Sequence, residues 1–222
     1  MIKLVSFDWN GTLFADTTAL VKGVNVILKL FNHKPVTIQE YRNHFDVPVR
    51  RTYIGVGLSE SQVDNNSKLI AETYHPIYEA SAAKSRTRAN SKKLLRWLEK
   101  EKISSIIFSN HIEDKIIMQL KRLKIERYFS TVLANYHIES SQKSRMKKEK
   151  LREYIKIKKL RPMDVLIIGD TIEEVEIGKE LGCTTIAITN GSCSTSRLKS
   201  SKPDFLISNL SEVIGIINKL NN

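Results

Sequence analysis

The stretch that decides the fold is DWNGTL, residues 8–13, directly after the apolar run IKLVSF of residues 2–7. The apolar run predicts a buried strand, and Asp8 stands where that strand ends. A buried carboxylate is costly unless a partner or a function holds it there. Gly11 and Thr12 indicate a turn that lets the backbone approach a ligand. Because open α/β sheets bind ligands at this end of their strands, we expect Asp8 to lie in a functional site.

The composition indicates a soluble globular protein. The chain has 222 residues, of which 41% are hydrophobic and 27% charged, and this length suits one large domain or a core with a small insert. No apolar run approaches the ~18–20 residues of a membrane span, and the chain opens with a strand-like segment rather than a signal sequence. Cys183 and Cys193 form neither a disulfide framework nor a metal-binding spacing. We therefore expect free thiols, a cytoplasmic location and no membrane partner.

The charge balance is strongly basic, with a net charge of +12. One interpretation is a protein that binds nucleic acid or another anion. The other is a lysine-rich surface, because the basic residues are scattered and only the segment 143–159 is dense in them. The sequence has no basic strand rich in aromatic residues and no zinc knuckle. We therefore expect no nucleic-acid partner, and a positive field that attracts a small phosphorylated substrate.

Short apolar runs alternate with amphipathic segments along the chain. The apolar runs predict buried strands at residues 4–7, 103–108, 131–133, 165–168, 184–189 and 205–207. Helical periodicity covers residues 113–123, 147–160, 173–181 and 211–220, with Gly182 expected to end the third of these helices. This alternation predicts an α/β fold with a Rossmann-like, doubly wound parallel sheet that is covered on both faces.

The long gap between the first two predicted strands indicates a helical insert. Residues 17–31 and 63–78 carry apolar side chains in helical register, and the second helix is expected to stop near Pro76. Thr37 and Glu40 have the spacing of a capping box, and the small polar residues 81–90 indicate a linker before a helix capped by Ser91. We expect an α/β core at residues 1–15 and 86–222, and a small α-helical cap domain at 16–85 over the functional edge of the sheet.

Two further segments could bind phosphate. Ser109 and Asn110 follow the strand predicted at 103–108, where a hydroxyl and exposed amides would bind a phosphate oxygen. The alternative is a plain strand-to-helix turn. Lys147 begins the basic helix, and one lysine that reached the site would neutralise phosphate and carboxylate charge. For most lysines of this helix, a solvated charged face is the expected role.

A second carboxylate follows the strand predicted at 165–168. Asp170 comes after Gly169, and together with Asp8 it would form an oxygen-rich site suited to Mg²⁺. Glu173 or Glu174 could add a further contact. The alternatives are a helix N-cap for Asp170 and a favourable position in the helix dipole for the glutamates.

In this order and placement, the four segments resemble the haloacid dehalogenase (HAD) superfamily of hydrolases over nearly the whole chain. The resemblance implies that Asp8 is the nucleophile and a ligand of Mg²⁺. Asn10 stands at the position that gives its backbone carbonyl to the metal and usually carries an acid/base carboxylate. Asp170 then completes the metal site, with Glu174 where a second aspartate is usual.

The resemblance also implies a set of phosphate-binding residues. The lysine of this family lies about two dozen residues before the last acidic motif, which selects Lys147, with Lys148 one position away and Lys143 too far upstream. The implied phosphate-binding residues are Thr12, Ser109, Asn110 and Lys147. The implied catalytic residues are Asp8, Asn10 and Lys147, and the implied metal ligands are Asp8, Asn10 and Asp170.

The insert and the form DWNGTL resemble the phosphoglycolate-phosphatase-like branch of the superfamily, as does YRNHFDVPVR at residues 41–50. This branch implies a Mg²⁺-dependent phosphatase that hydrolyses a small phosphorylated metabolite through an aspartyl-phosphate on Asp8. Residues of the insert would select the substrate, and the candidates are His33, His44, Arg50, Arg51 and Tyr53.

Asn10 departs from the family pattern, because an amide cannot carry out the proton transfer of the usual aspartate. Three explanations are open. The substrate has a leaving group that needs little protonation, or a residue of the insert such as His44 or Glu40 supplies the proton. In the third, the chain is a weakly active or non-catalytic phosphate-binding or regulatory protein. Because Asp8, Ser109, a lysine and Asp170 are all present, we expect catalysis.

Overall fold

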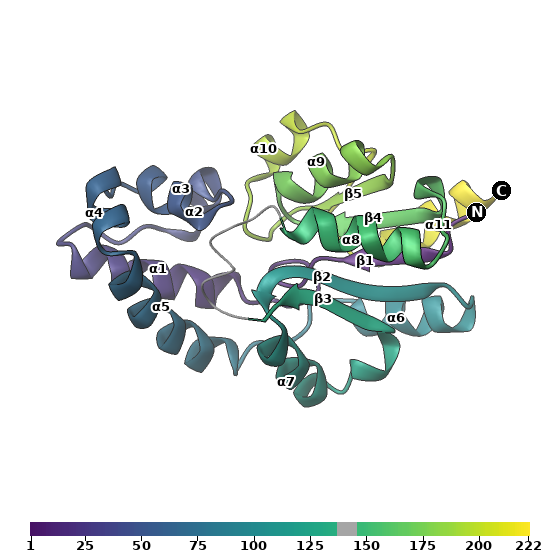
Figure 1. Cartoon of the computed structure of the whole chain (residues 1–222), viewed down its shortest axis with the longest axis horizontal. Coiled ribbons are helices and arrows are strands. Elements are labelled where there is room, and N and C mark those ends of the chain that lie inside the picture. The colour runs from purple at the N-terminus through teal and green to yellow at the C-terminus, as the bar shows by residue number, and fades with distance from the viewer. Residues whose placement is uncertain (137–145) are drawn as a thin grey trace.

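The computed structural model describes residues 1–136 and 146–222 and contains a six-stranded parallel sheet. The strand order is β3-β2-β1-β4-β5-β6, which places the first strand in the middle (Figure 1). This order confirms the predicted Rossmann-like, doubly wound α/β fold. The strands are β1 (Leu4–Phe7), β2 (Ser104–Ile112), β3 (Thr131–Asn135), β4 (Val165–Gly169), β5 (Thr184–Ile188) and β6 (Phe205–Ile207).

The strand order reverses next to β1, and this is the point where sheets of this kind bind ligands. Phe7, the last residue of β1, pairs with Ile107 of β2 and with Ile168 of β4. The residues that follow β1 and β4 therefore leave the sheet side by side. The backbone N–H of Asp8 donates to the carbonyl of Ile168 at 2.8 Å, and this hydrogen bond fixes the backbone of Asp8 at the edge of the sheet.

Helices cover both faces of the sheet because side chains alternate along each buried strand. Val5 and Phe7 pack into the apolar cluster formed with α6, α7 and α11, whereas Leu4 packs into the cluster formed with α8 and α9. The core helices are α6 (Ser91–Lys100), α7 (Glu113–Leu123), α8 (Met146–Ile157), α9 (Ile172–Leu181), α10 (Thr195–Ser200) and α11 (Glu212–Asn221). Gly182 ends α9 in the left-handed region with φ +74°, as predicted.

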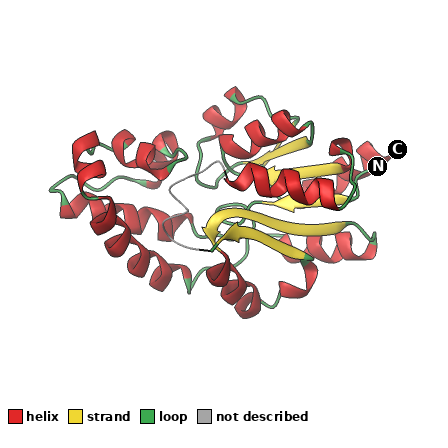
Figure 2. Cartoon of the chain, in the orientation of Figure 1, coloured by secondary structure: helices red, strands yellow, loops and turns green. Residues whose placement is uncertain are grey.

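The segment between β1 and α6 is helical and lies to one side of the sheet (Figure 2). It has an apolar cluster of its own, to which Val24, Ile27, Tyr41, Tyr53 and Ile70 belong. Thr37 and Glu40 form the predicted capping box of the second helix. The helices are α1 (Thr17–Leu30), α2 (Ile38–His44), α3 (Val49–Gly55), α4 (Glu60–Asn65) and α5 (Ser67–Ala82).

The last part of this segment differs from the prediction. The helix predicted at residues 63–78 is divided into α4 and α5, and α5 continues through Pro76 to Ala82 instead of stopping. Tyr78 and Ala82, which follow the proline, are buried in the apolar cluster of the sheet. Their burial offsets the local cost of proline in a helix. As a result, the linker is shorter than predicted.

Two smaller predictions have mixed outcomes. Ser91 is the first residue of α6 rather than its cap, and its hydroxyl donates to the carbonyl of Arg88 at 2.7 Å. Cys183 and Cys193 are buried free thiols, as predicted. In the described part of the chain, no helix has the length and apolar character needed to cross a membrane.

The proline inside α5 generates a stability prediction. Replacement Pro76→Ala should stabilise the protein by roughly 1–3 kcal/mol, because alanine restores a backbone hydrogen bond and removes the ring from an exposed helical position. Urea unfolding followed by circular dichroism measures the change. The control Ser81→Ala, in the last turn of the same helix, should change stability by less than about 0.5 kcal/mol. A destabilised Pro76→Ala protein would show that the proline has a required packing role.

Candidate active site

A buried lysine connects the ends of β1, α8 and α9. The ammonium Nζ of Lys147 lies 2.8 Å from Oδ1 of Asp8 and 3.7 Å from Oε2 of Glu173, and it also contacts Oε1 of Glu174. The side chains of Lys147, Asp8 and Glu174 are 2%, 9% and 3% exposed. Lys148, one residue later, lies outside this cluster and pairs with Glu180 at 2.6 Å. The structure therefore places Lys147 in the position expected for the phosphate-binding lysine.

The charges of this cluster do not balance. Burial raises the pKa of Asp8 well above its usual range, and Glu174 and Asp170 raise it further, while Lys147 opposes them. Burial also raises the pKa of Asp170 to about 6 and of Glu173 to about 7. The pKa of Lys147 is raised by its carboxylate partners in spite of its burial. One ammonium thus faces several carboxylates, and the site has an excess of buried negative charge.

Asp170 is held in a narrow space between two glycines. A Cβ atom added to Gly11 or to Gly191 would lie 2.2 Å from Oδ2 of Asp170. Gly11 also has φ +69°, which disfavours other residues. The hydroxyl of Thr12 donates to Oδ1 at 2.9 Å, and the backbone N–H of Ser192 donates to Oδ2 at 2.5 Å. The carboxylate is therefore fixed at the edge of the sheet and is not a helix cap; Thr171 caps α9 instead.

Asn10 is held by a second buried carboxylate, which the sequence analysis did not single out. The amide Nδ2 of Asn10 donates to Oδ2 of Asp16 at 2.6 Å and to the hydroxyl of Tyr78 at 2.7 Å. Asp16 is fully buried and also accepts hydrogen bonds from the Gly11 N–H and the Tyr78 hydroxyl, at 2.9 Å and 2.7 Å. Burial raises the pKa of Asp16, although these donors oppose the shift. Within residues 1–136 and 146–222, the side-chain carbonyl oxygen Oδ1 of Asn10 has no hydrogen-bond partner.

The end of β2 supplies a hydroxyl, an amide and an imidazole. Ser109 is buried, and its hydroxyl accepts a hydrogen bond from the backbone N–H of His111 at 3.2 Å. The amide of Asn110 donates to Glu173 at 2.7 Å, which joins this strand end to α9. Nε2 of His111 lies 3.3 Å from Oε1 of Glu79 on α5. His111 therefore connects the sheet edge to the helical segment.

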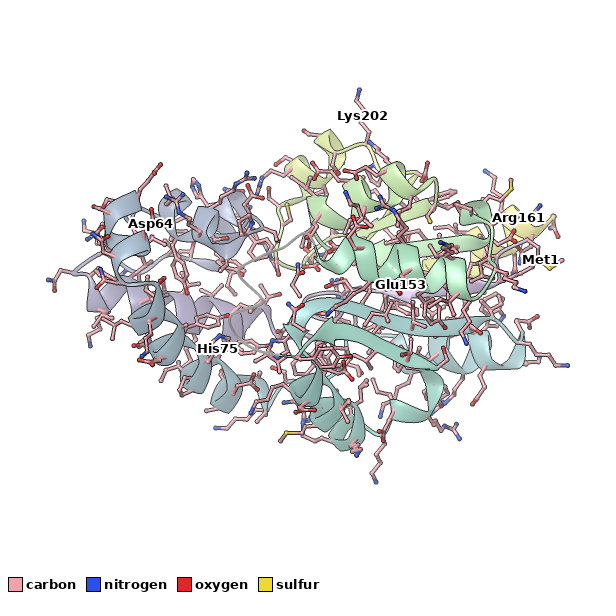
Figure 3. All side chains as sticks on the ribbon, viewed as in Figure 1. Met1, Asp64, His75, Glu153, Arg161 and Lys202 are labelled. Carbon is pink, nitrogen blue, oxygen red and sulfur yellow. The ribbon has the colours of Figure 1, made fainter. Side chains whose placement is uncertain are left out.

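These groups face one cavity of about 470 Å³ that also reaches α1, α2, α4 and α5. Asp64 and His75, labelled in Figure 3, line it from α4 and α5. The expected site residues that line the cavity are Asp8, Asn10, Ser109, Asn110 and Lys147, together with Glu173 and Glu174. Thr12 and Asp170 are fully buried and do not line it.

Several expectations are changed by this geometry. The hydroxyl of Thr12 is engaged by Asp170, so we assign Thr12 to positioning that carboxylate instead of to phosphate contact. Glu40 is exposed in its capping box and His44 is exposed on α2, and neither lines the cavity. The insert residues that line it from the predicted set are Arg50 and Tyr53. Lys143 lies outside the described residues.

Some residues of the site were not predicted, because the contacts that place them there depend on the folded chain. Asp16 precedes α1 as its N-cap residue, and its side chain makes no capping hydrogen bond. Arg88, placed in the predicted linker, donates to the carbonyls of Gly11 and Thr189, both at 2.7 Å, and ties together the loops after β1 and β5. His75 and His111 line the cavity with no motif to indicate it.

The donor set at the sheet edge fits a Mg²⁺ ion. In the described residues, no group of three or more His, Cys, Asp or Glu side chains is arranged to hold a metal. Mg²⁺ does not need three protein side chains as ligands, because it is commonly bound by one or two carboxylates together with water and substrate phosphate. Burial raises the pKa of Asp8 most, and repulsion from Glu174 and Asp170 adds to the shift. A divalent cation between Asp8 and Asp170 would remove the repulsion between these two carboxylates.

Because several carboxylates share one buried ammonium, replacing Lys147 should cost much more folding stability than replacing its neighbour Lys148. Lys147→Met should destabilise the protein at pH 7 by about 3–5 kcal/mol, because the carboxylates lose their only buried counter-ion among the described residues. Lys148→Met should cost less than about 1 kcal/mol. The loss for Lys147→Met should shrink between pH 7 and pH 4, since carboxyls whose pKa is raised in the folded state take up protons first there. Urea unfolding at several pH values checks this, and equal losses for the two variants would contradict it.

Known proteins resemble this chain in sequence and in fold. The family of haloacid dehalogenase-like hydrolases matches residues 5–188. Phosphoglycolate phosphatase 1 of Pseudomonas aeruginosa is 25% identical, over 96% of this chain and 78% of its own length. A pyrophosphatase PpaX of Bacillus mycoides is 21% identical, over 99% of both chains.

Solved structures show the same fold. A haloacid dehalogenase-like family hydrolase of Streptococcus pneumoniae superposes with a TM-score of 0.80 at 19% identity, over 97% of this chain and 98% of the other. A predicted phosphatase of Clostridium acetobutylicum superposes with a TM-score of 0.83 at 17% identity, over 99% of both. The match over most of the chain confirms the predicted family: the protein belongs to the haloacid dehalogenase-like hydrolases.

Proposed function

We propose that this hydrolase is a Mg²⁺-dependent phosphatase that acts on a small phosphorylated metabolite through an aspartyl-phosphate on Asp8. The observation that carries the proposal is the buried contact of Lys147 with Asp8, in a cavity that Ser109 also lines. A carboxylate held by an ammonium beside a hydroxyl fits a phosphoryl group in transfer. The names of the relatives, phosphoglycolate phosphatase and pyrophosphatase, support the phosphatase class.

The chain's own residues divide the work of two steps. In the first, a carboxylate oxygen of Asp8 attacks phosphorus, and the bond from phosphorus to the leaving oxygen breaks. Lys147 and the Ser109 hydroxyl bind the phosphoryl oxygens, which carry negative charge throughout. In the second step, water attacks the phosphorus of the aspartyl-phosphate, releasing inorganic phosphate and restoring the carboxylate. Asp8, Asp170 and the backbone carbonyl of Asn10 would hold Mg²⁺, which neutralises phosphate charge when bound.

Asn10 has a limited part in this chemistry. Asp16 and Tyr78 hold its amide nitrogen, and the remaining carbonyl oxygen is only an acceptor. It can orient the attacking water, but it cannot protonate the leaving oxygen. His111 lines the same cavity beside Ser109 and has Glu79 as its partner. We propose His111 as the proton donor, in place of the His44 or Glu40 expected from the sequence.

We further propose that residues 16–85 are a cap domain on a core formed by residues 1–15 and 86–222. The apolar cluster within α1–α5 supports a separate domain, and the cavity between these helices and the sheet edge supports a role in enclosing substrate. We also propose a cytoplasmic location.

The central experiment measures phosphate release from a panel of phosphorylated metabolites with and without Mg²⁺. The wild-type protein should hydrolyse at least one ester only with Mg²⁺, and Asp8→Asn should lose this activity by about 10³-fold or more, because an amide is not a nucleophile here. The matched control Asp114→Asn, at an exposed position of α7, should be fully active. Labelled phosphate should remain on the wild-type protein after rapid quenching and be released by hydroxylamine. Full activity of Asp8→Asn would exclude Asp8 as the nucleophile.

A second experiment tests how much turnover is lost because position 10 carries asparagine instead of aspartate. In Asn10→Asp, the new carboxyl would lie next to Asp16, whose Oδ2 is 2.6 Å from the present amide nitrogen. Two carboxyls at this distance share one proton, so the pair keeps a general acid at neutral pH. We expect turnover of simple phosphate esters to rise by about 10²-fold. The gain should be lost as pH rises through the raised pKa of the pair.

The double variant Asn10→Asp with Asp16→Asn is the control for this shared proton. Without the second carboxyl, the new one ionises at lower pH, and the gain should move to the acid side. An unchanged or lower rate in Asn10→Asp would show that a carboxyl at position 10 adds nothing to the proton supplied by His111. His111→Gln should lower the rate on alkyl phosphates and change little the rate on nitrophenyl phosphate, whose weakly basic leaving group needs no protonation.

A further inference from the structure

We propose that the ester hydrolysed at this site has an uncharged, largely apolar leaving group, an alkyl or aryl alcohol. This inference rests on the proposed phosphatase function and names its substrate class. It comes from the part of the cavity that lies beyond the phosphate-binding residues. The cavity of about 470 Å³ is much larger than a phosphoryl group, so most of its volume is available to the leaving group.

The far part of the cavity is formed by the apolar cluster of the insert. Val24, Val63 and Ile70 line it and are 2%, 5% and 5% exposed. Tyr41 and Tyr53 line it as well, and burial holds the pKa of both phenols above the usual value, so they are neutral at physiological pH. This wall offers aliphatic groups and aromatic faces to a ligand.

The charged side chains of this wall already have partners. Nε and Nη2 of Arg50 lie 2.6 Å and 2.7 Å from the two carboxylate oxygens of Asp64, and Nη2 lies 3.0 Å from Glu60. Asp46 pairs with Arg51 at 3.7 Å. Burial lowers the pKa of His75, which favours its neutral form. In the described part of the wall, no unpaired cation is therefore present to bind a second anionic group.

This arrangement favours one kind of substrate over the two that the names of the relatives suggest. The carboxylate of phosphoglycolate or the second phosphate of pyrophosphate would lose its hydration against apolar side chains without gaining a counter-ion, which is unfavourable. An alkyl or aryl group would gain from the same burial, at about fourfold in affinity for each methylene removed from water. The cavity therefore favours esters with an uncharged apolar leaving group and disfavours substrates with a second anionic group.

The test compares straight-chain alkyl phosphates with 2-phosphoglycolate, using the Mg²⁺-loaded wild-type protein. From ethyl to butyl to hexyl phosphate, kcat/KM should rise by about fourfold for each added methylene until the cavity is filled. Hexyl phosphate should exceed 2-phosphoglycolate by at least about 10²-fold. A flat chain-length profile, or a preference for 2-phosphoglycolate, would overturn the proposal.

A matched pair of variants on α5 adds a second readout. Ala71 lines the cavity, whereas Ala80 is exposed on the same helix and does not. Ala71→Arg places a cation in the apolar wall. The kcat/KM for hexyl phosphate should therefore fall by about 10-fold or more, and the kcat/KM for 2-phosphoglycolate should rise. Ala80→Arg should leave the kcat/KM values for both substrates as they are in the wild-type protein. Equal effects of the two variants would contradict a specific apolar subsite.

Failure of the phosphatase function can be told apart from failure of this proposal. If no ester is hydrolysed, calorimetric titration of the Asp8→Asn protein with ethyl and hexyl phosphate measures the cavity alone. Tighter binding of hexyl phosphate, by about fourfold per methylene, supports the apolar subsite even when the catalytic proposal fails. Equal affinity for the two esters overturns it.

Discussion

The contact of Lys147 with Asp8 is the interaction on which the site depends. The lysine is buried beside Phe108, whose ring lies 4.5 Å from its ammonium, and it also contacts both glutamates of α9. A buried ammonium is stable only with such partners, and buried carboxylates are stable only with such a cation. The two requirements fix α8, α9 and the end of β1 relative to one another. The same contact favours the charged form of Asp8 and opposes the burial that raises its pKa.

The excess of carboxylates over cations connects stability with function. Raised pKa values at Asp8, Asp170 and Glu173 mean that the folded protein disfavours full ionisation of the site. A divalent cation held by Asp8 and Asp170 would reverse this preference, since it would stabilise the ionised carboxylates only in the folded arrangement. Gly11 and Gly191 keep Asp170 close enough for such a role, because any side chain at either position would displace it. Metal affinity and folding stability are therefore expected to change together with pH.

The sequence predicted the features that depend on local pattern. Buried parallel strands are short apolar runs, so all six were located. The residues that follow β1 and β4, and Ser109 and Asn110 in the last part of β2, were recognised as site candidates. The spacing that selected Lys147 over Lys148 matches the structure because one position changes the helix face. Features that depend on distant packing were missed. Pro76 is helical because Tyr78 and Ala82 are buried, and Asp16 holds an amide six residues away and a phenol sixty-two residues away.

The pairing of Asn10 with Asp16 shows how a change at one catalytic position depends on its neighbour. A carboxylate at position 10 would meet Asp16 at hydrogen-bonding distance, and two ionised groups there would repel. An amide avoids the repulsion and donates to Asp16, which satisfies a carboxylate with no solvent contact. The amide therefore stabilises the loop after β1 at the expense of proton transfer. Any proton for the leaving group would then come from another element, and we propose the imidazole of His111, which lies between the sheet edge and α5, as that donor.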